Sequence, residues 1–428
     1  MADRDANGAG SAGSGATPDS RLGLLRELGE QAVLEAIFRR GPVTRPEIAS
    51  ATGLSKPTVG AAVGRLEQAG MISAIGPQHG RRGRSPIAYV VRDNAGFVVG
   101  LDIGGTKIRA GAADMFGEMI HDEQEPTTKT GGRSLAAQLV DVTTRVVERG
   151  RVTHDRLLAI GISTPGVVDR DTGRVRLAYN VSPDGALDPL GAVGSRFGVP
   201  VLLDNNINLA ALGEKSFGLA RGVSTMVFIG VGAGVGMGII MHDELVRGAH
   251  GGAGEIGYLP LAGDPFDPRH KLHGGLEDEI GAAGVLAAFG TRAPQRTGET
   301  STAQDVFELA GLGDDDAGAV VEHIAARLGS AIATVCAILD PELVVLGGGI
   351  GSSPLLLSPV RGAAAALVPL TARIETSLLG DQAALRGAIA VALHAARSQL
   401  IPQSGGPANR TTAAHGRRRV AVGGEPVR

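Results

Sequence analysis

The stretch Val98–Gly111, which reads VVGLDIGGTKIRAG, decides the fold. Its apolar, β-branched start predicts a buried strand that reaches Asp102 and then a turn of two glycines, Thr106 and Lys107. A Gly-rich turn directly after a strand is typical of a backbone that closes around a phosphate. We therefore expect a strand–turn–strand hairpin whose turn can bind an anion.

Two further Gly-rich turns follow strand-like runs. Residues 228–248 repeat the order of residues 101–120, namely strand, Gly-rich turn, strand and polar turn, and a third turn, LGGGI at 346–350, follows the apolar run 343–346. One such hairpin is weak evidence because a tight turn alone explains it, but three of them indicate a cleft for phosphates. The candidate nucleotide contacts are Asp102, Gly104, Gly105, Thr106, Lys107, Gly232, Gly234 and Gly348.

Length and composition restrict the class of protein. With 428 residues, 43% apolar and 20% charged, the chain can form two or three globular units. Cys336 is the only cysteine, so a disulfide within the chain is impossible and a cysteine-based zinc site is not expected. The N-terminus lacks the apolar core of a signal peptide, and Asp340, Pro341 and Glu342 interrupt the best candidate for a membrane span. We expect a cytoplasmic protein that does not enter a membrane.

Charge and low-complexity segments divide the chain. Residues 21–92 contain eleven Lys and Arg against five Asp and Glu, whereas the whole chain has a formal charge of −3. A basic first part on an acidic remainder indicates one end that binds a polyanion. Residues 1–20 and 401–428 are rich in small and polar residues without apolar periodicity, which predicts two disordered tails.

Three short helices are predicted between residues 22 and 70. The first has apolar residues at 33, 34, 37 and 38, and the second begins with a capping box made of Thr44 and Glu47. Gly53 makes the turn to a third helix, which Ser55 caps and which has Pro57 in its first turn. The buried stripe of the third helix is expected at Val59, Ala62, Val63 and Leu66.

Residues 21–93 as a whole predict a winged helix-turn-helix, whose second helix fits the major groove of DNA. Strand-like runs around residues 76–85 form the wing, and arginines at its tip suit the minor groove or the backbone. A small helical interaction domain with a solvated basic loop is the alternative, but helix spacing, capping and wing all agree with DNA binding. The expected DNA contacts are Thr44, Arg45, Ser55, Lys56, Thr58, Ala61, Arg65, Arg81, Arg82 and Arg84.

Four short motifs in order resemble the ROK family, which comprises repressors, open reading frames and sugar kinases. They read DIGGTK at 102–107, GISTPGVVD at 161–169, NNINLAALGE at 205–214 and GAGEIG at 252–257. The chain is similar to the family's transcriptional regulators, which carry an N-terminal winged helix-turn-helix. The resemblance implies an α/β fold in which this domain precedes a two-lobed, actin-like (ribonuclease-H-like) sugar-kinase-type body, with sugar and ATP bound between the lobes.

The same resemblance implies how the body is organised. The small lobe is expected at residues 94–212, and the large lobe, with the oligomerisation and ligand surface, at 213–380. A C-terminal helix at 381–400 is expected to return to the small lobe.

The chain departs from the family's kinases at the residue that serves them as the general base. Those kinases are expected to carry Asn-Asp where this chain has Asn205-Asn206, and the Asp takes the proton from the sugar hydroxyl. An amide cannot take up that proton, and loss of a positioned base costs about 10²–10⁴ in rate. We therefore expect no enzyme, unless the neighbouring Asp204, whose side chain is expected to leave the strand end in another direction, serves as the base.

Two more departures concern metal and ATP. Tyr258 stands where family members carry a zinc-ligating His, and the following loop, residues 265–277, has no cysteine. His270 and His273 are expected on the loop surface, so no metal site is predicted. Ala233 stands in the second phosphate turn where a kinase is expected to carry a hydroxyl, which weakens the case for ATP turnover.

A sugar cleft remains, because a polyhydroxyl ligand needs paired donors and acceptors. Aromatic residues make up only 3% of the chain and Trp is absent, so polar contacts have to carry recognition. For Asn205 and Asn206 the alternative is to cap the helix that follows. The resemblance places Asn205, Glu255 and Glu277 at positions that contact sugar hydroxyls, and Asn206 can still donate and accept hydrogen bonds there. Tyr258 is the fifth candidate sugar contact.

Three functions are therefore open. The first is a repressor of carbohydrate metabolism that binds double-stranded operator DNA and a sugar or sugar derivative, without a cofactor. The second is a bifunctional ATP-dependent sugar kinase that also binds DNA, and the third is a DNA-binding scaffold that responds to no ligand. A homodimer or higher homo-oligomer is expected, because one helix-turn-helix buries too little surface for useful specificity.

Overall fold

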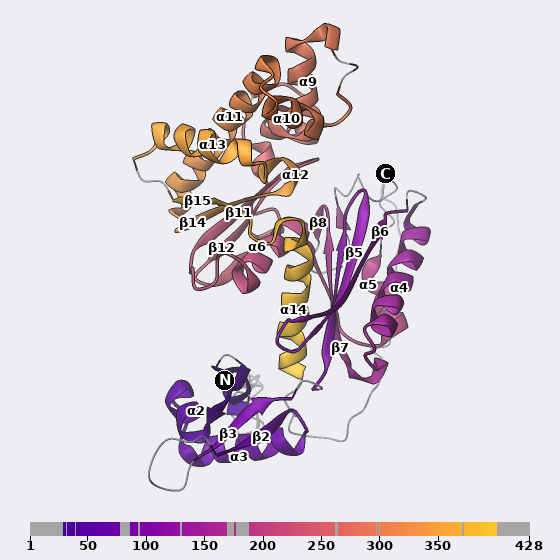
Figure 1. The fold of residues 1–428 in the computed structure, drawn as a ribbon, viewed down its shortest axis with the longest axis vertical. Helices are drawn as coiled ribbons and strands as arrows, with labels where there is room; N and C mark the ends of the chain where they lie inside the picture. Colours follow the sequence, from indigo (N-terminus) through magenta and orange to yellow (C-terminus); the bar gives the residue numbers. More distant parts are fainter. Residues whose placement is uncertain are drawn as a thin grey trace, which may run out of the picture. The chain divides into compact units, whose positions relative to one another are not determined.

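The computed structural model describes residues 29–30, 32–38, 40–77, 86–92, 95–128, 131–168, 175–176, 188–261, 264–296, 298, 300–369 and 372–399. Arg81, Arg82, Arg84 and both predicted tails lie outside these residues. The chain divides into two compact units, with the boundary between Val91 and Arg92 (Figure 1).

The N-terminal unit combines helices with a small antiparallel sheet. A helical segment at residues 32–38 precedes α2 (Arg45–Thr52) and α3 (Lys56–Gln68). The sheet has the order β1-β3-β2, formed by Val43–Thr44, Ile87–Val91 and Ile72–Pro77. Its core contains fully buried side chains from each helix, among them Ile37, Ile48, Val59 and Leu66. This is the fold of a winged helix, as the sequence predicts.

Local capping fixes the two helices of this unit. Thr44 and Glu47 form the predicted capping box of α2, and Gly53 ends α2 in the left-handed conformation with φ of 70°. Ser55 caps α3 by accepting the backbone N–H of Thr58 at 3.3 Å. The buried residues of α3 are the predicted stripe, Val59, Ala62, Val63 and Leu66. Capping and periodicity therefore predicted both helices correctly.

A mixed five-stranded sheet of order β10-β7-β4-β5-β6 forms the first lobe of the second unit. Strands β4, β7 and β10 are parallel, and β5 and β6 run antiparallel to their neighbours. Their bounds are Phe97–Ile103 (β4), Lys107–Asp114 (β5), Met119–Pro126 (β6), Leu157–Thr164 (β7) and Val201–Asn205 (β10). The hairpin β4–β5 is thus the one that residues 98–111 predict.

Helices cover both faces of this sheet. Apolar side chains of α4 (Gly131–Arg149) and α5 (Pro189–Phe197) pack on one face in a single core cluster. The C-terminal helix α14 (Ala383–Gln399) packs on the other face against β4 and β7 and also along α6 (Asn206–Phe217). The approach is so close that a Cβ atom at Gly161 would lie 2.0 Å from the carbonyl oxygen of Ala388. Glycine is therefore required there for α14 to reach the sheet.

The second lobe repeats the topology of the first. Its sheet has the order β13-β12-β11-β14-β15, so an antiparallel meander is again extended by parallel strands. The bounds are Met226–Val231 (β11), Val235–Met241 (β12), Glu244–Val246 (β13), Leu343–Gly347 (β14) and Arg373–Thr376 (β15). The internal repeat that the sequence indicates is therefore a repeated sheet, as in actin-like folds.

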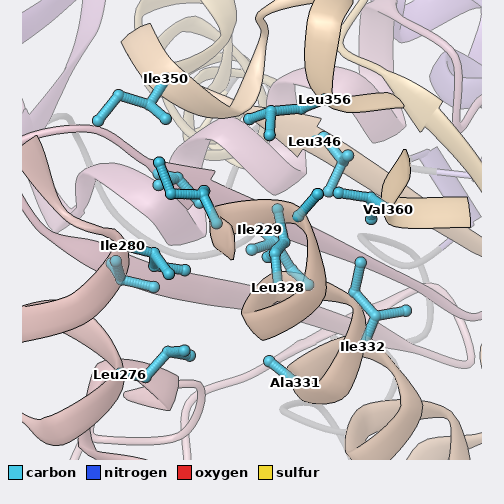
Figure 2. Close-up of a cluster of buried hydrophobic side chains, with 14 of the residues drawn as sticks. Ile229, Leu276, Ile280, Leu328, Ala331, Ile332, Leu346, Ile350, Leu356 and Val360 are labelled. Carbon is cyan, nitrogen blue, oxygen red and sulfur yellow. The ribbon is translucent and has the colours of Figure 1, made fainter. Parts of the chain in front are cut away.

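The core of the second lobe lies between this sheet and its helices. Figure 2 shows Leu328 and Ile332 of α11 (Asp315–Leu339) and Val360 of α13 (Pro354–Leu367) beside Ile229 and Leu346 of the sheet. The smaller helices are His270–His273 (α7), Gly275–Ile280 (α8), Ala282–Arg292 (α9), Ala303–Gly311 (α10) and Gly348–Gly351 (α12).

The remaining elements are short. A two-stranded ribbon pairs β8 with β9, and four 3₁₀ turns connect other elements. Their bounds are Val167–Val168 (β8), Val175–Arg176 (β9), His154–Arg156 (η1), Ile256–Tyr258 (η2), Pro294–Arg296 (η3) and Gly380–Gln382 (η4).

The apolar run that Asp340, Pro341 and Glu342 interrupt is the end of helix α11. Helix α11 is long and apolar enough to cross a membrane by length and composition alone. The charged residues of α11 are Asp315, Asp316, Glu322 and Arg327, and residues 328–339 carry no charge. Its apolar face contributes twelve buried residues, most of them in the core of the second lobe. Its apolar character is therefore that of a core helix.

Candidate ligand site and nucleic-acid interface

A row of polar side chains crosses the first sheet where its parallel strands end. Asp204, Ser163 and Asp102 are in-register partners on β10, β7 and β4, and Arg109 is the partner of Asp102 on β5. Register partners point to the same face of a sheet. This face is the one that α14 covers, because Gly161, two residues before Ser163, contacts α14. The hairpin and the candidate base Asp204 thus belong to one polar row.

Asp102 is held by two partners within the protein. Its carboxylate is 8% exposed, accepts the Ser163 hydroxyl at 2.7 Å and lies 3.5 Å from the Arg109 guanidinium. Desolvation raises the pKa of Asp102 above its usual value, against the opposing effects of Ser163 and Arg109. Asp102, expected to contact a nucleotide, is therefore fully engaged by its own chain.

Arg109 links Asp102 to a residue far away in the sequence. Its guanidinium donates to Asp381 in η4, directly before α14, and Lys107 Nζ lies 3.4 Å from the same oxygen. Partial burial acts to raise the pKa of Asp381, but Arg109 and Lys107 outweigh it and hold the pKa below its usual value. Two cations and two carboxylates therefore meet beside the Gly-rich turn.

Asp204 is engaged on both of its carboxylate oxygens. Oδ1 accepts the backbone N–H of Asn205 at 2.8 Å and the Asn208 amide at 3.2 Å. Oδ2 accepts Nε–H of Arg247 at 2.8 Å, and a terminal nitrogen of the same guanidinium lies 2.7 Å from the same oxygen. Asp204 is therefore part of a partly buried ion pair that joins β10 to the segment after β13.

A cavity of about 220 Å³ lies beside this ion pair. Amide and charged groups line one part of it and apolar groups the rest. The lining residues are Asp204, Asn205, Asn208, Arg247, Val168, Leu202, Leu203, Gly251 and Val391. Of the five candidate sugar contacts, only Asn205 lines this cavity.

Asn205 is the N-cap of α6, which confirms the alternative reading of this residue. Its side-chain oxygen accepts the N–H groups of Ile207 and Asn208 at 2.8 and 3.3 Å, and its amide donates to the carbonyl of Gly166 at 2.8 Å. Asn206 is the first residue of α6 and is half-buried. The capping interaction therefore uses Asn205, and the side chain of Asn206 is the one that a ligand can still recruit.

Two other candidate sugar contacts, Glu255 and Glu277, are near neighbours in the second lobe. Glu277 on α8 accepts the backbone N–H of Val235 at 2.8 Å, and desolvation raises its pKa against the effect of that hydrogen bond. Desolvation also raises the pKa of Glu255, and Glu277 adds to the rise. Tyr258, on the short turn after Glu255, is 43% exposed. The structure thus brings the two carboxylates together but away from the cavity lining.

The glycines of the second and third turns have packing reasons of their own. Gly232 donates its N–H to the carbonyl of Gly234 at 2.9 Å, and a Cβ atom at Gly234 would lie 2.9 Å from a carboxylate oxygen of Glu277. Gly348 has φ of 81°, and a Cβ atom there would lie 2.4 Å from the carbonyl of Val231. Close packing accounts for Gly234 and Gly348, whereas a Cβ atom at Gly232 would make only an ordinary contact, 3.7 Å from the nitrogen of Gly349. The nucleotide contacts of all three glycines remain a prediction.

Metal ligands are not grouped in the part of the chain that the structure describes. No cluster of three or more His, Cys, Asp or Glu residues there has the arrangement of a metal site. His270 Nδ1 instead lies 2.8 Å from the Asp278 carboxylate.

The exposed face of α3 provides the candidate DNA contacts. Lys56, Thr58 and Ala61 are exposed, and the hydroxyls of Ser55 and Thr58 lie 2.7 Å apart. Arg45 is also exposed, with its guanidinium 5.3 Å from the centre of the Tyr89 ring. A cation, a hydroxyl and a methyl group on one helix suit phosphates, base edges and the thymine methyl group.

Two other candidates have partners within the unit. Thr44 is buried and its hydroxyl donates to Glu47 at 2.7 Å, so it serves the capping box. Arg65 is partly buried and its Nε pairs with Glu30, which is 1% exposed. Arg65 therefore ties α3 to the first helical segment, whereas the sequence predicts it as an outward DNA contact.

Sequence reasoning missed five residues of these networks: Ser163, Arg109, Asp381, Arg247 and Glu30. An arginine inside the apolar strand 107–114 was a usable signal for Arg109, because a buried charge requires a partner. No local pattern indicates Asp381, which lies 272 residues from Arg109 in the sequence.

Comparison with known proteins agrees with this architecture. Residues 98–395 match the ROK family, and residues 23–83 match the MarR family. A xylose repressor from Caldicellulosiruptor bescii is 28% identical over 389 residues, covering 86% of this chain and 96% of that protein. A glucokinase from Halalkalibacterium halodurans is 32% identical over 278 residues, covering 61% of this chain and 83% of that protein.

A solved structure shows the same fold. The crystal structure of a ROK family transcriptional regulator, a homologue of the E. coli MLC protein, has a TM-score of 0.75 at 21% identity, covering 88% of this chain and 98% of that one. The chain belongs to the ROK family, and it carries a MarR-type winged helix in front of the ROK body. The repressor match covers more of this chain than the glucokinase match does, which is the pattern of the family's transcriptional regulators.

Proposed function

We propose that this protein is a cytoplasmic, homodimeric repressor of carbohydrate metabolism, which binds operator DNA through its winged helix and a sugar or sugar derivative through its ROK body. The observation that carries this proposal is the exposed face of α3 in front of a body whose kinase groups are engaged internally. Relatives that match across most of the chain are named xylose repressors, which supports the same conclusion.

The engagement of Asp204 and the identity of Asn206 support a body without kinase activity. A sugar kinase needs a carboxylate that can accept the hydroxyl proton in the transition state. Asn206 has no such group, and Asp204 already accepts three hydrogen bonds and forms an ion pair with Arg247. Both carboxylate oxygens of Asp204 are therefore engaged within the chain, so rescue by Asp204 would require Arg247 to move away first.

The bifunctional kinase remains the second candidate, because relatives that match the body include glucokinases and the hairpin DIGGTK is present. It requires Arg247 to release Asp204 when sugar and ATP bind. Consumption of ATP that depends on a sugar is therefore the observation that separates the two candidates.

Xylose is the first sugar to test, since several relatives are named xylose repressors. Purified full-length protein is titrated on its own upstream DNA with xylose, other sugars and their phosphates, and ADP release is followed in the same samples. A change in operator affinity caused by one sugar without ADP release supports the repressor. Sugar-dependent ADP release supports the kinase and makes Asp204 the first residue to substitute.

A further inference from the structure

The cluster of Asp102, Arg109 and Asp381 bears on whether the ROK body can bind a nucleotide with its metal ion. The family resemblance places ATP at the Gly-rich hairpin, and ATP reaches kinases as a complex with Mg²⁺, a cation that prefers carboxylate and phosphate oxygens. Asp102 lies on this hairpin, and Asp381 contacts it through Arg109 and Lys107. Whether Mg²⁺ fits there depends on what lies between them.

Arg109 occupies the space between the two carboxylates. Its guanidinium is bonded to both and the residue is only 7% exposed, so it is enclosed rather than mobile at the surface. Lys107 Nζ lies 3.4 Å from the same oxygen of Asp381. Since arginine cannot lose its proton in a protein, its charge is permanent. A divalent cation on these carboxylates would have to displace Arg109 or share its ligands with it.

Neighbouring contacts hold the cluster in place. Ser163 fixes the other oxygen of Asp102 with a bond of 2.7 Å. Glu214 of α6 is fully buried and accepts the hydroxyl of Ser377 and the N–H of Leu379, which fixes the segment that leads to Asp381. Ser163 therefore positions Asp102, whereas the Asp381 side chain, 66% exposed, is held by Arg109 and Lys107 on a segment that Glu214 fixes.

We infer that Arg109 takes the place of a divalent cation on the Asp102–Asp381 pair, so that the body binds its sugar without metal or nucleotide. Mg²⁺-nucleotide does not fit the residues present, because a guanidinium already bridges the carboxylates. The inference rests on the proposed repressor function, since a kinase would need the cation. In this role Arg109 is structural: it joins strand β5 of the hairpin to Asp381, directly before α14.

Mn²⁺ titration of the full-length protein, followed by electron paramagnetic resonance, tests the inference. The wild type is expected to bind no Mn²⁺ at this pair, whereas Arg109→Met is expected to bind one ion with a Kd of about 1 mM or tighter, as weak carboxylate sites do. Adding Asp381→Asn to Arg109→Met should abolish that binding. The matched control is Arg145→Met, which also removes an arginine bridging two carboxylates, Glu123 and Glu125, and should gain no ion.

Every result of the Mn²⁺ titration either supports the inference about Arg109 or overturns it. Wild-type Mn²⁺ binding that Asp102→Asn abolishes would overturn the inference, as would failure of folded Arg109→Met to gain an ion. If Arg109→Met does not fold, Arg109→Gln, which retains an amide donor for the carboxylates without the charge, is judged by the same two outcomes.

The proposed function is judged separately, by operator binding of the wild type in EDTA and in Mg²⁺-ATP. A sugar response that needs Mg²⁺ would refute the inference and leave the repressor intact. A complete lack of sugar response would refute the repressor and leave the Mn²⁺ result unaffected.

Discussion

At the scale of single residues, ion pairs decide which groups of the ROK body are free for chemistry. Asp204 is bonded to Arg247 and Asn208, and Asp102 to Ser163 and Arg109. Each carboxylate is paired with a neighbour in the same chain. Substitution of these residues should therefore change stability before it changes any reaction.

Asp204→Asn should destabilise the protein by about 1–3 kcal/mol, the cost of leaving the partly buried Arg247 without its charged partner. Urea unfolding of the full-length protein measures this. The matched control is Glu375→Gln, which removes the carboxylate partner of the more exposed Arg361 and should cost less than about 1 kcal/mol. Equal losses for the two variants would mean that the Asp204–Arg247 pair contributes no more than a surface ion pair.

Glu277→Gln should stabilise the protein at neutral pH. The pKa of Glu277 is raised, chiefly by desolvation, so the folded state binds the proton more tightly than the unfolded state and loses stability as pH rises from about 4.5 through the folded pKa. Glutamine removes the charge and keeps an acceptor for the N–H of Val235. Unfolding curves between pH 4 and 7 should show less dependence on pH in the variant.

Asp305→Asn provides the control of opposite sign. Backbone N–H groups of Ser301 and Thr302 hold the pKa of Asp305 at about 2, so the stability that it contributes is present above pH 3.8 and lost as pH falls towards 2. This variant should lower stability at pH 7. Destabilisation of Glu277→Gln at pH 7 would show that its charge is not a cost to the fold.

At the scale of elements, the residues of one helix divide into those that hold it and those that face outward. Lys56 on α3 is exposed, whereas Arg65 on the same helix pairs with the buried Glu30. Sequence spacing placed both on the outer face. The difference depends on Glu30, 35 positions earlier, which no pattern within α3 reveals.

Lys56→Ala should weaken binding to specific and non-specific DNA alike and reduce the slope of log affinity against log salt by about 1, as expected for one lost phosphate contact. The thermal unfolding midpoint should not change. Fluorescence anisotropy with labelled operator at several salt concentrations measures the slope. An unchanged slope would place Lys56 outside the DNA interface.

Arg65→Ala should behave in the opposite way. Removing Arg65 leaves a buried carboxylate, Glu30, without its cation, and such a loss is strongly destabilising. The N-terminal unit should unfold at a lower temperature or urea concentration, and DNA binding should fall only as far as the unit unfolds. A stable variant with a reduced salt slope would instead make Arg65 a phosphate contact.

Helices and turns that depend on neighbouring residues could be predicted from the sequence. Contacts between residues far apart in the chain could not. The capping box of α2, the stripe of α3 and the hairpin β4–β5 follow from neighbouring residues, so their prediction succeeded. The cluster of Arg109 with Asp381 forms only when α14 returns to the first sheet. For Asn205 the sequence leaves both a helix cap and a sugar contact open, and the geometry of α6 shows the cap.

At the scale of the whole molecule, a winged helix is joined to a ROK body whose two lobes repeat one sheet topology. If the body sets the spacing of two DNA-binding units in a dimer, a fragment that ends at Arg92 should bind operator weakly and with strong salt dependence. Anisotropy titration of the fragment beside the full chain measures this. Equal affinity would mean that the body does not organise recognition.

The central claim is that a sugar in the body and DNA on the winged helix affect one another's binding. The most direct measurement is calorimetric titration of the full-length protein with xylose, or the sugar that alters operator binding, with and without saturating operator. Linkage requires the factor by which operator changes the sugar Kd to equal the factor by which the sugar changes the operator Kd. We predict equal factors, both clearly different from one, in the absence of ATP. A sugar Kd that operator DNA leaves unchanged would contradict the account.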